Sequence, residues 1–328
     1  MKKYDVAALG ELLIDFTENG VSAQGNPVME ANPGGAPCNV LALLQKLGHT
    51  TGFIGKVGKD MFGNQLEKAF QEVGISTECL IRDPEVNTTL AFVHTFEDGD
   101  RDFSFYRKPG ADMMLSKEDI TTDAVQNMIR SAKIFHFGSL SMTAPVCRKA
   151  TREAIRIAEE AGCIISFDPN LREPLWSSLD AAREQIAYGM GKCHMLKISD
   201  NEISWFTGTS DYEEGVQILR DTYPNIQLLL VSLGKDGSMA FSGGVKVQIP
   251  AFLQPDTIET TGAGDTFCGS VLHYLLENNE QRGEIRVFTA EELTEMVTFA
   301  NAAASLITTR KGALRVMPER KEILAMLH

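Results

Sequence analysis

The chain has 328 residues, of which 43% are hydrophobic and 23% are charged, and its formal net charge is −13. This is the composition of a folded globular protein, and the acidic balance argues against nucleic acid as the main partner, because a phosphate backbone needs clustered Lys and Arg. The N-terminus starts with two lysines, but Asp5, Glu11 and Asp15 interrupt its apolar run, which predicts a first strand instead of a signal peptide. No run of about 18 apolar residues occurs, so we expect no membrane span and a soluble, cytoplasmic protein.

Short apolar runs alternate with helical patterns along most of the remaining chain. The patterns predict strands at 133–140, 163–170, 194–199 and 226–234, and helices at 144–162, 181–190 and 201–208. Short buried strands separated by helices are typical of a parallel sheet that is covered on both faces. The predicted fold class is therefore α/β, with a doubly wound, mostly parallel sheet flanked by helices.

Two segments, at about 12–32 and 88–112, interrupt this alternation. The second alternates around an "EDGD" turn at 97–100, as an antiparallel hairpin would. We expect the two segments to form a small sheet over the main one, serving as a lid or a dimerisation surface; an edge hairpin without function is the alternative. Exposed aromatic residues on this sheet would suit a homodimer, namely Phe92, Phe103 and Phe105.

The cysteines and histidines show no metal-binding spacing. The six cysteines are scattered without a C-x-x-C pair, and the six histidines contain no H-E-x-x-H. A cytosolic chain of this kind is expected to hold reduced thiols, several of them in apolar surroundings. The spacings predict no metal site built from protein ligands alone.

A glycine-rich segment directly precedes a helical pattern near the C-terminus. The stretch "ETTGAGDTFCG" covers 259–269, and apolar residues at helical spacing follow it. Gly262, Ala263 and Gly264 should therefore lie at a helix N-terminus, where unpaired N–H groups suit a phosphate. An aspartate beside an anion site, here Asp265, is unfavourable unless it takes part in the chemistry.

These residues alone leave two roles open for Asp265. In phosphoryl transfer, the N–H groups of 262–265 would hold the phosphate while Asp265 accepts the proton of the attacking hydroxyl. Alternatively, Asp265 caps the helix through a side-chain hydrogen bond. Other phosphate motifs are missing: no G-x-x-x-x-G-K-[ST] occurs and no G-x-G-x-x-G follows the first strand, which argues against a P-loop and a dinucleotide-binding Rossmann domain.

Two long segments carry a resemblance to a known family. Residues 256–272, "DTIETTGAGDTFCGSVL", contain Asp265, and residues 32–63 begin "NPGGAPCNV". In this order and separation they resemble the two signatures of the PfkB/ribokinase-type carbohydrate kinases, and "RDFSFYRKPGAD" and "FDPNLREPLW" are typical of the fructokinase branch. The resemblance implies one ribokinase-like kinase domain over 1–328, with the two inserted segments as its lid and Asp265 as its catalytic base.

The resemblance also implies a sugar-binding set: Asp15, Gly34, Gly35, Asn39, Arg107, Asn170 and Arg172. Carboxylates and amides offer several hydrogen bonds to a polyol, glycine permits close backbone approach, and an arginine fork grips phosphate oxygens. The glycine pair could instead form only a turn, and Arg107 could be only a solvated charge.

For ATP the resemblance implies a second set: Lys197, Ser232, Gly234, Gly237, Gly264 and Asn301, with 308–313 continuing the pocket. Glycine turns explain several of these without a ligand, and Lys197 could lie on the surface. Mg²⁺ would be organised through water by Glu202, although Ser199 stands where the family usually has Asn. Glu259 stands where many relatives place Asp in a loop that binds a monovalent cation, which leaves activation by K⁺ open.

The function implied is an ATP-dependent kinase that phosphorylates the 6-hydroxyl of fructose. A kinase of the same fold acting on 2-keto-3-deoxygluconate is the alternative, since Arg172 would suit a substrate carboxylate. A non-catalytic sensor of sugar or nucleotide is a further alternative, although a sensor has no need of the base Asp265.

Overall fold

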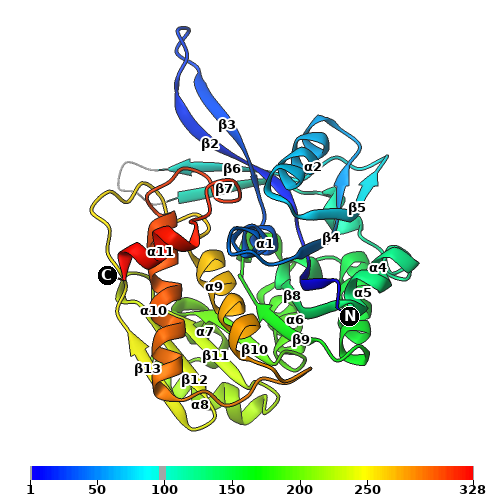
Figure 1. Ribbon diagram of the computed structural model, residues 1–328. Coiled ribbons are helices and arrows are strands. Elements are labelled where there is room, and N and C mark those ends of the chain that lie inside the picture. The colour runs from blue at the N-terminus through cyan, green and yellow to red at the C-terminus, as the bar shows by residue number, and fades with distance from the viewer. Residues whose placement is uncertain (1, 96–100, 328) are drawn as a thin grey trace.

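A nine-stranded sheet forms the centre of the computed structural model, which describes residues 2–95 and 101–327 (Figure 1). Its strand order is β13-β12-β11-β10-β9-β8-β1-β4-β5, and every pairing is parallel except β11–β12 and β12–β13. The strands are β1 Tyr4–Leu9, β4 Thr51–Gly58, β5 Ser76–Asp83, β8 Ala132–Gly138, β9 Ile164–Asp168, β10 Met195–Ser199, β11 Leu228–Ser232, β12 Ser238–Ser242 and β13 Val245–Ile249. The predicted α/β class with a mostly parallel sheet is confirmed.

Helices cover both faces of this sheet. Alternate residues of β1 belong to different cores: Val6 and Ala8 pack with α1, α2, α9, α10 and α11, whereas Ala7 and Leu9 pack with α3 to α8. The helices are α1 Ala36–Lys46, α2 Met61–Val73, α3 Lys117–Ile120, α4 Asp123–Arg130, α5 Pro145–Glu160, α6 Leu179–Met190, α7 Asp200–Thr207, α8 Tyr212–Thr222, α9 Ala263–Asn278, α10 Ala290–Ile307 and α11 Arg320–Met326. Short 3₁₀ turns lie at Ala111–Met114, Ser139–Met142, Glu173–Leu175 and Gly234–Asp236.

A separate four-stranded sheet comes from the two inserted segments. Its order is β3-β2-β6-β7, with strands β2 Leu13–Val21, β3 Pro27–Gly34, β6 Leu90–Thr95 and β7 Arg101–Tyr106. Two antiparallel hairpins meet along the parallel pair β2–β6. Figure 1 shows this sheet at one end of the molecule, with the β2–β3 hairpin extending away from the main sheet.

The small sheet corrects one expectation about exposure. Phe92 and Phe105 are half-buried, and Phe92 stacks on Phe16 with ring centroids 4.8 Å apart. Among the side chains of this sheet that the structure describes, the large apolar ones that are exposed are Val21, Val28 and Tyr106. The side chain of Phe103 and the turn expected at 97–100 lie outside the described residues.

The predicted strands and helices of the main sheet are confirmed with small changes at their ends. The helix expected at 144–162, for example, runs from Pro145 to Glu160. All six cysteines are buried and free of disulfides, as the scattered spacing indicated. In the part of the chain that the structure describes, we find no helix with the length and apolarity that crossing a membrane requires.

Parallel pairing brings several polar strand ends to one edge of the main sheet. Asp168 ends β9 level with Gly138 of β8, and Ser199 ends β10 level with Ser232 of β11. In open α/β sheets, ligands bind at this carboxyl edge.

Candidate active site

Helix α9 begins directly at the glycine-rich segment. Gly262 is its N-cap, with a φ of 78° that favours glycine, and no side chain caps the helix. The N–H of Ala263 donates to the Thr260 carbonyl at 3.2 Å. Gly264 and Asp265 lie in the first turn, where N–H groups have no partner within the helix. Gly264 and Asp265 therefore lie at a helix N-terminus, as the sequence predicted, and their binding of an anion stays a prediction.

Asp265 faces α1 instead of its own helix. Its Oδ2 accepts a hydrogen bond from Nδ2 of Asn39 at 2.8 Å. With no side-chain cap on α9, the alternative that Asp265 only caps this helix is wrong. Burial raises the pKa of Asp265, and the Asn39 amide, Lys197 and Arg172 offset only part of that effect. A carboxylate with a raised pKa is a better proton acceptor near neutral pH.

Asn39 is anchored and still has unused hydrogen-bonding capacity. The residue is only 4% exposed, and its Oδ1 is buried without a partner. A buried unpaired polar atom is costly, so this oxygen indicates a place where a ligand donor would fit.

Asp15 on β2 lies against the glycine pair. A Cβ on Gly34 would come within 2.1 Å of Oδ2 of Asp15, and a Cβ on Gly35, whose φ is 126°, within 2.3 Å of the Glu11 carbonyl oxygen. A larger residue would displace the Asp15 side chain at Gly34 and the backbone of Glu11 at Gly35. Gly34 therefore makes room for the Asp15 carboxylate, and Gly35 makes room for the Glu11 carbonyl.

The charge on Asp15 is held in a crowded acidic environment. Burial raises the pKa of Asp15 to about 7; Arg172 acts in the opposite direction, and Asp265 and Glu259 raise it further. The carboxylate of Asp15 on β2 therefore lies close enough to that of Asp265 on α9 for the two charges to repel each other.

Lys197 is buried at the carboxyl edge of the sheet and is not a surface residue. Its Nζ lies 3.0 Å from Oδ2 of Asp168, and the lysine is 6% exposed. Burial alone would lower the pKa of Lys197, but the carboxylates of Asp168 and Glu202 outweigh burial and raise it. The ammonium group also lies 3.2 Å from the position of a Cβ on Gly264, so it flanks the α9 N-terminus.

A cavity of about 640 Å³ opens beside this helix end. Its lining includes nearly all of the predicted nucleotide side and two predicted sugar-side residues: Lys197, Ser232, Gly234, Gly237, Gly264, Asn301, Asn170 and Arg172. Ligand pockets commonly have this size and a mixed lining. Asp15, Gly34, Asn39 and Asp265 lie on the α1 side of the same helix end.

The residues that line the cavity differ in whether their side chains already make hydrogen bonds within the protein. The Asn301 side chain accepts from the Ser238 hydroxyl at 2.8 Å and donates to two backbone carbonyls. Asn301 therefore shapes the wall. Asn170 holds a φ of 44°, the one positive φ outside glycine among the described residues, and Arg172 is exposed.

Glu202 closes a capping box at the start of α7. Its Oε2 accepts from the N–H and hydroxyl of Ser199 at 2.8 and 2.7 Å, and its Oε1 accepts from the Leu171 N–H at 2.6 Å. Ser199 thus suits the helix N-cap in the position where Asn was expected. The carboxylate lines the cavity while it also fixes the loop that carries Asn170 and Arg172.

Arg107 is buried and not a solvated charge. At 4% exposure, it pairs with Asp112 at 2.6 Å and donates to the Thr143 hydroxyl and the Leu140 carbonyl, both at 3.0 Å. Its side chain ties β7 to the turn after β8. Its contact with a sugar stays a prediction.

Two buried carboxylates were not identified from the sequence. Glu11 accepts from the Ala36 N–H at 2.9 Å at the start of α1, its Oε2 is unpartnered, and burial raises its pKa to about 7. Asp168 holds Lys197, and burial raises its pKa to about 6. Asp168 stands at the end of a predicted strand, a position that could have marked it; Glu11 offered no such signal.

The fold and the site together define a class of phosphotransferase. A family model described as "pfkB family carbohydrate kinase" matches residues 3–320, and the chain belongs to this family. The protein is accordingly a kinase that acts on a sugar hydroxyl.

Within the family, the chain is similar to fructokinases. It is 39% identical over 326 residues to "Probable fructokinase-2" of Arabidopsis thaliana, covering 98% of this chain and 95% of the relative. A fructokinase of Xylella fastidiosa with bound ATP superposes with a TM-score of 0.86 at 30% identity, covering 100% and 98% of the two chains.

A fructokinase of Vibrio cholerae O395 binds fructose, ADP and a calcium ion in its structure. It superposes with a TM-score of 0.86 at 29% identity, and both chains are covered completely. A double mutant of that enzyme holds fructose, ADP and a potassium ion.

Proposed function

We propose that the protein transfers the γ-phosphoryl group of ATP to the 6-hydroxyl of fructose and so forms fructose 6-phosphate. The observation that carries this proposal is the position of the Asp265 carboxylate, which Asn39 holds at the N-terminus of α9. Asp15 lies on one side of this helix end and the large cavity on the other. The relatives named above support the choice of fructose and of ATP.

Asp265 is the base of this reaction. Its carboxylate takes the proton from the 6-hydroxyl as that oxygen forms a bond to the γ-phosphorus, and the bond to the bridging oxygen of ADP breaks. The N–H groups of Gly264 and Asp265, with Lys197 beside them, stabilise the transferring phosphoryl group. The raised pKa of Asp265 suits proton acceptance near neutral pH.

The sugar is held on the α1 side of Asp265. Asp15 and the free Oδ1 of Asn39 accept hydrogen bonds from its hydroxyl groups, and Gly34 and Gly35 let the backbone approach it. Arg172 and Asn170 reach the same point from the edge of the cavity, where an arginine fork suits a phosphate.

The nucleotide occupies the cavity beside Ser232, Gly234, Gly237 and Asn301. A divalent ion, Mg²⁺ with ATP, would neutralise phosphate charge. Glu202 fits a water-mediated role, since both of its oxygens already accept protein hydrogen bonds yet an ionised carboxylate retains further lone pairs. K⁺ would bind, if at all, in the loop that contains Glu259.

The small four-stranded sheet acts as the lid of a single kinase domain and as a dimer surface. Excluding water by lid closure would prevent idle hydrolysis of ATP. Val21, Val28 and Tyr106 expose apolar area that a second copy of the chain would cover.

The test is an ADP-release assay with Mg²⁺–ATP on fructose, glucose, ribose and 2-keto-3-deoxygluconate. Turnover on fructose is expected. Turnover on the keto acid alone would keep the mechanism but assign Arg172 to a substrate carboxylate, and ligand binding with no turnover on any of them would indicate a sensor. An identical KM for fructose at low and high salt is expected, because a neutral sugar is not screened.

Replacing Asp15 with Asn should stabilise the protein while it weakens sugar binding. Because burial raises the folded-state pKa of Asp15 to about 7, above its value in the unfolded chain, the ionised group destabilises the fold above that pH. We expect unfolding at pH 8 to cost about 1–2 kcal/mol more in Asp15→Asn, a fraction of the full shift because the site opens to solvent. This gain in the free energy of unfolding should vanish at pH 4, where the Asp15 carboxyl is protonated in the folded protein.

Chemical denaturation at pH 8 and pH 4 measures this difference, and calorimetry with fructose measures the binding. A loss of stability at pH 8 would contradict the prediction. Asp200→Asn, which changes a half-buried carboxylate that lines the same cavity, is the matched control and should change neither quantity.

A further inference from the structure

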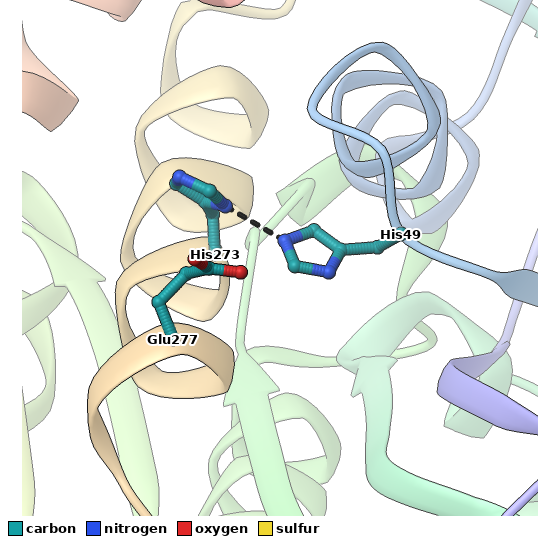
Figure 2. A group of neighbouring side chains, drawn as sticks. All are labelled: His49, His273 and Glu277. Carbon is teal, nitrogen blue, oxygen red and sulfur yellow. Dashed lines mark hydrogen bonds between the residues drawn. The ribbon is translucent and has the colours of Figure 1, made fainter.

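Two histidines from distant parts of the chain meet at the side of α9, which carries one of them. His49 lies in the loop between α1 and β4, and His273 lies on α9. Nε2 of His49 and Nδ1 of His273 are 2.7 Å apart, and both residues are less than 9% exposed. Figure 2 shows the two rings directed at each other, with Glu277 beside them on α9.

The three side chains converge as metal ligands would. One ligand atom of each lies within 4.8 Å of the other two. His273 and Glu277 are four residues apart on a helix, so they share one face. Zinc needs neighbouring imidazole nitrogens roughly 3.3 Å apart at a tetrahedral angle, so the histidine pair would have to open by only about 0.6 Å.

A proton has to move before both histidines can bind a metal through their facing nitrogens. One ring proton lies between the two nitrogens. If His49 carries it, tautomerisation moves it to Nδ1, which lies 3.8 Å from Oδ2 of Asp5, and both rings stay neutral. A carboxylate behind a metal-ligating histidine is a common second partner.

Charges of both signs surround the pair. Asp5 and Glu277 favour a cation, while Lys133, which pairs with Asp5 at 2.8 Å, and Arg320 oppose it. The local charge therefore does not attract every cation strongly, and the choice of metal ion depends on the chemical type of the ligands. Imidazole favours zinc and its neighbours among the transition metals over Mg²⁺ and Ca²⁺.

An entry path is present. A cavity of about 520 Å³ is lined by His273, Glu277, Glu295 and Arg320, and Glu277 is exposed at its edge. Water in this cavity would complete a four-coordinate ion.

From this geometry we infer that His49, His273 and Glu277 form a binding site for one divalent transition-metal ion of the zinc class. The ion would cross-link the loop after α1 to α9. It is separate from the divalent ion that accompanies the nucleotide, and the inference does not depend on the proposed reaction.

Zinc titration of the full chain against a chromogenic chelator tests the site, with excess Mg²⁺ to occupy sites made only of carboxylates. One Zn²⁺ per chain is expected. His273→Gln, which keeps a side chain able to bond His49, should weaken binding by about 100-fold, and Glu277→Gln by about tenfold. Co²⁺ in place of zinc should give the visible absorption of a four-coordinate ion, and zinc should raise the melting temperature of the wild type but not of His273→Gln.

Two matched variants separate this site from its neighbours. Glu295→Gln removes a carboxylate from the same cavity, and Asp265→Asn alters the proposed active site; both should bind zinc as the wild type does. Equal zinc affinity in the wild type and in His273→Gln and His49→Gln would overturn the inference. So would the loss of binding in Asp265→Asn.

Discussion

Replacing Asp265 with Asn should lower kcat for the phosphorylation of fructose by about 10³-fold or more. Asn has nearly the same shape but cannot accept the hydroxyl proton, and positioned bases contribute about 10²–10⁴ to rates. The fold should survive, because the side-chain hydrogen bond from Asn39 can still form and the substitution removes an unfavourable buried charge. Steady-state kinetics with a coupled ADP readout measure the effect.

The dissociation constant for fructose shows whether Asp265→Asn acts on the chemical step or on sugar binding. It should change by less than a few-fold, since the amide still reaches Asn39. Asn39→Ala is the companion variant and should instead raise that constant, because it removes the free Oδ1. A kcat within tenfold of the wild type in Asp265→Asn would remove Asp265 from the role of base.

Replacing Asp112 with Ala should destabilise the protein by about 3–5 kcal/mol, because it leaves the charge of Arg107 buried without its partner. The two side chains are 2.6 Å apart, and each is only 2–3% exposed. Asp112 also accepts a hydrogen bond from the hydroxyl of Thr89, which directly precedes β6. Denaturant unfolding of the wild type and the variant measures the free energy.

A double variant distinguishes the buried charge from general damage. Arg107→Met combined with Asp112→Leu removes both charges and should recover much of the lost stability. If the single variant were as stable as the wild type, the pair would not hold β7 in place. If fructose affinity fell in the stable double variant, Arg107 would also contact the sugar.

The N-terminal end of α9 was predictable because its signal is local. A glycine pair around Ala263, an aspartate and a helical apolar pattern stand within a few residues of each other, and backbone physics alone places an anion site there. The parallel strands were predictable for a similar reason, since β8 to β11 are buried on both faces and read as continuous apolar runs.

Features that depend on distant pairs were not predictable. His49 and His273 stand 224 positions apart, so no spacing rule could bring them together. The same holds for Asn39 and Asp265, 226 positions apart, whose hydrogen bond excludes the capping role that sequence left open. The sequence could not decide whether Arg107 is a solvated charge, because its burial depends on Leu140 and Thr143, which follow the end of another strand.

The route of the chain through the small sheet constrains how that sheet can move. β3 ends at Gly34, Gly35 is the N-cap of α1, and Asn39 follows in the first turns of that helix. β2, which carries Asp15, is paired with both β3 and β6. The sheet therefore has no single hinge on which to swing, because displacing it pulls on Asp15 and on the start of α1 together. Motion of the sheet and assembly of the proposed sugar pocket should therefore occur together, and a displaced sheet would leave that pocket incomplete.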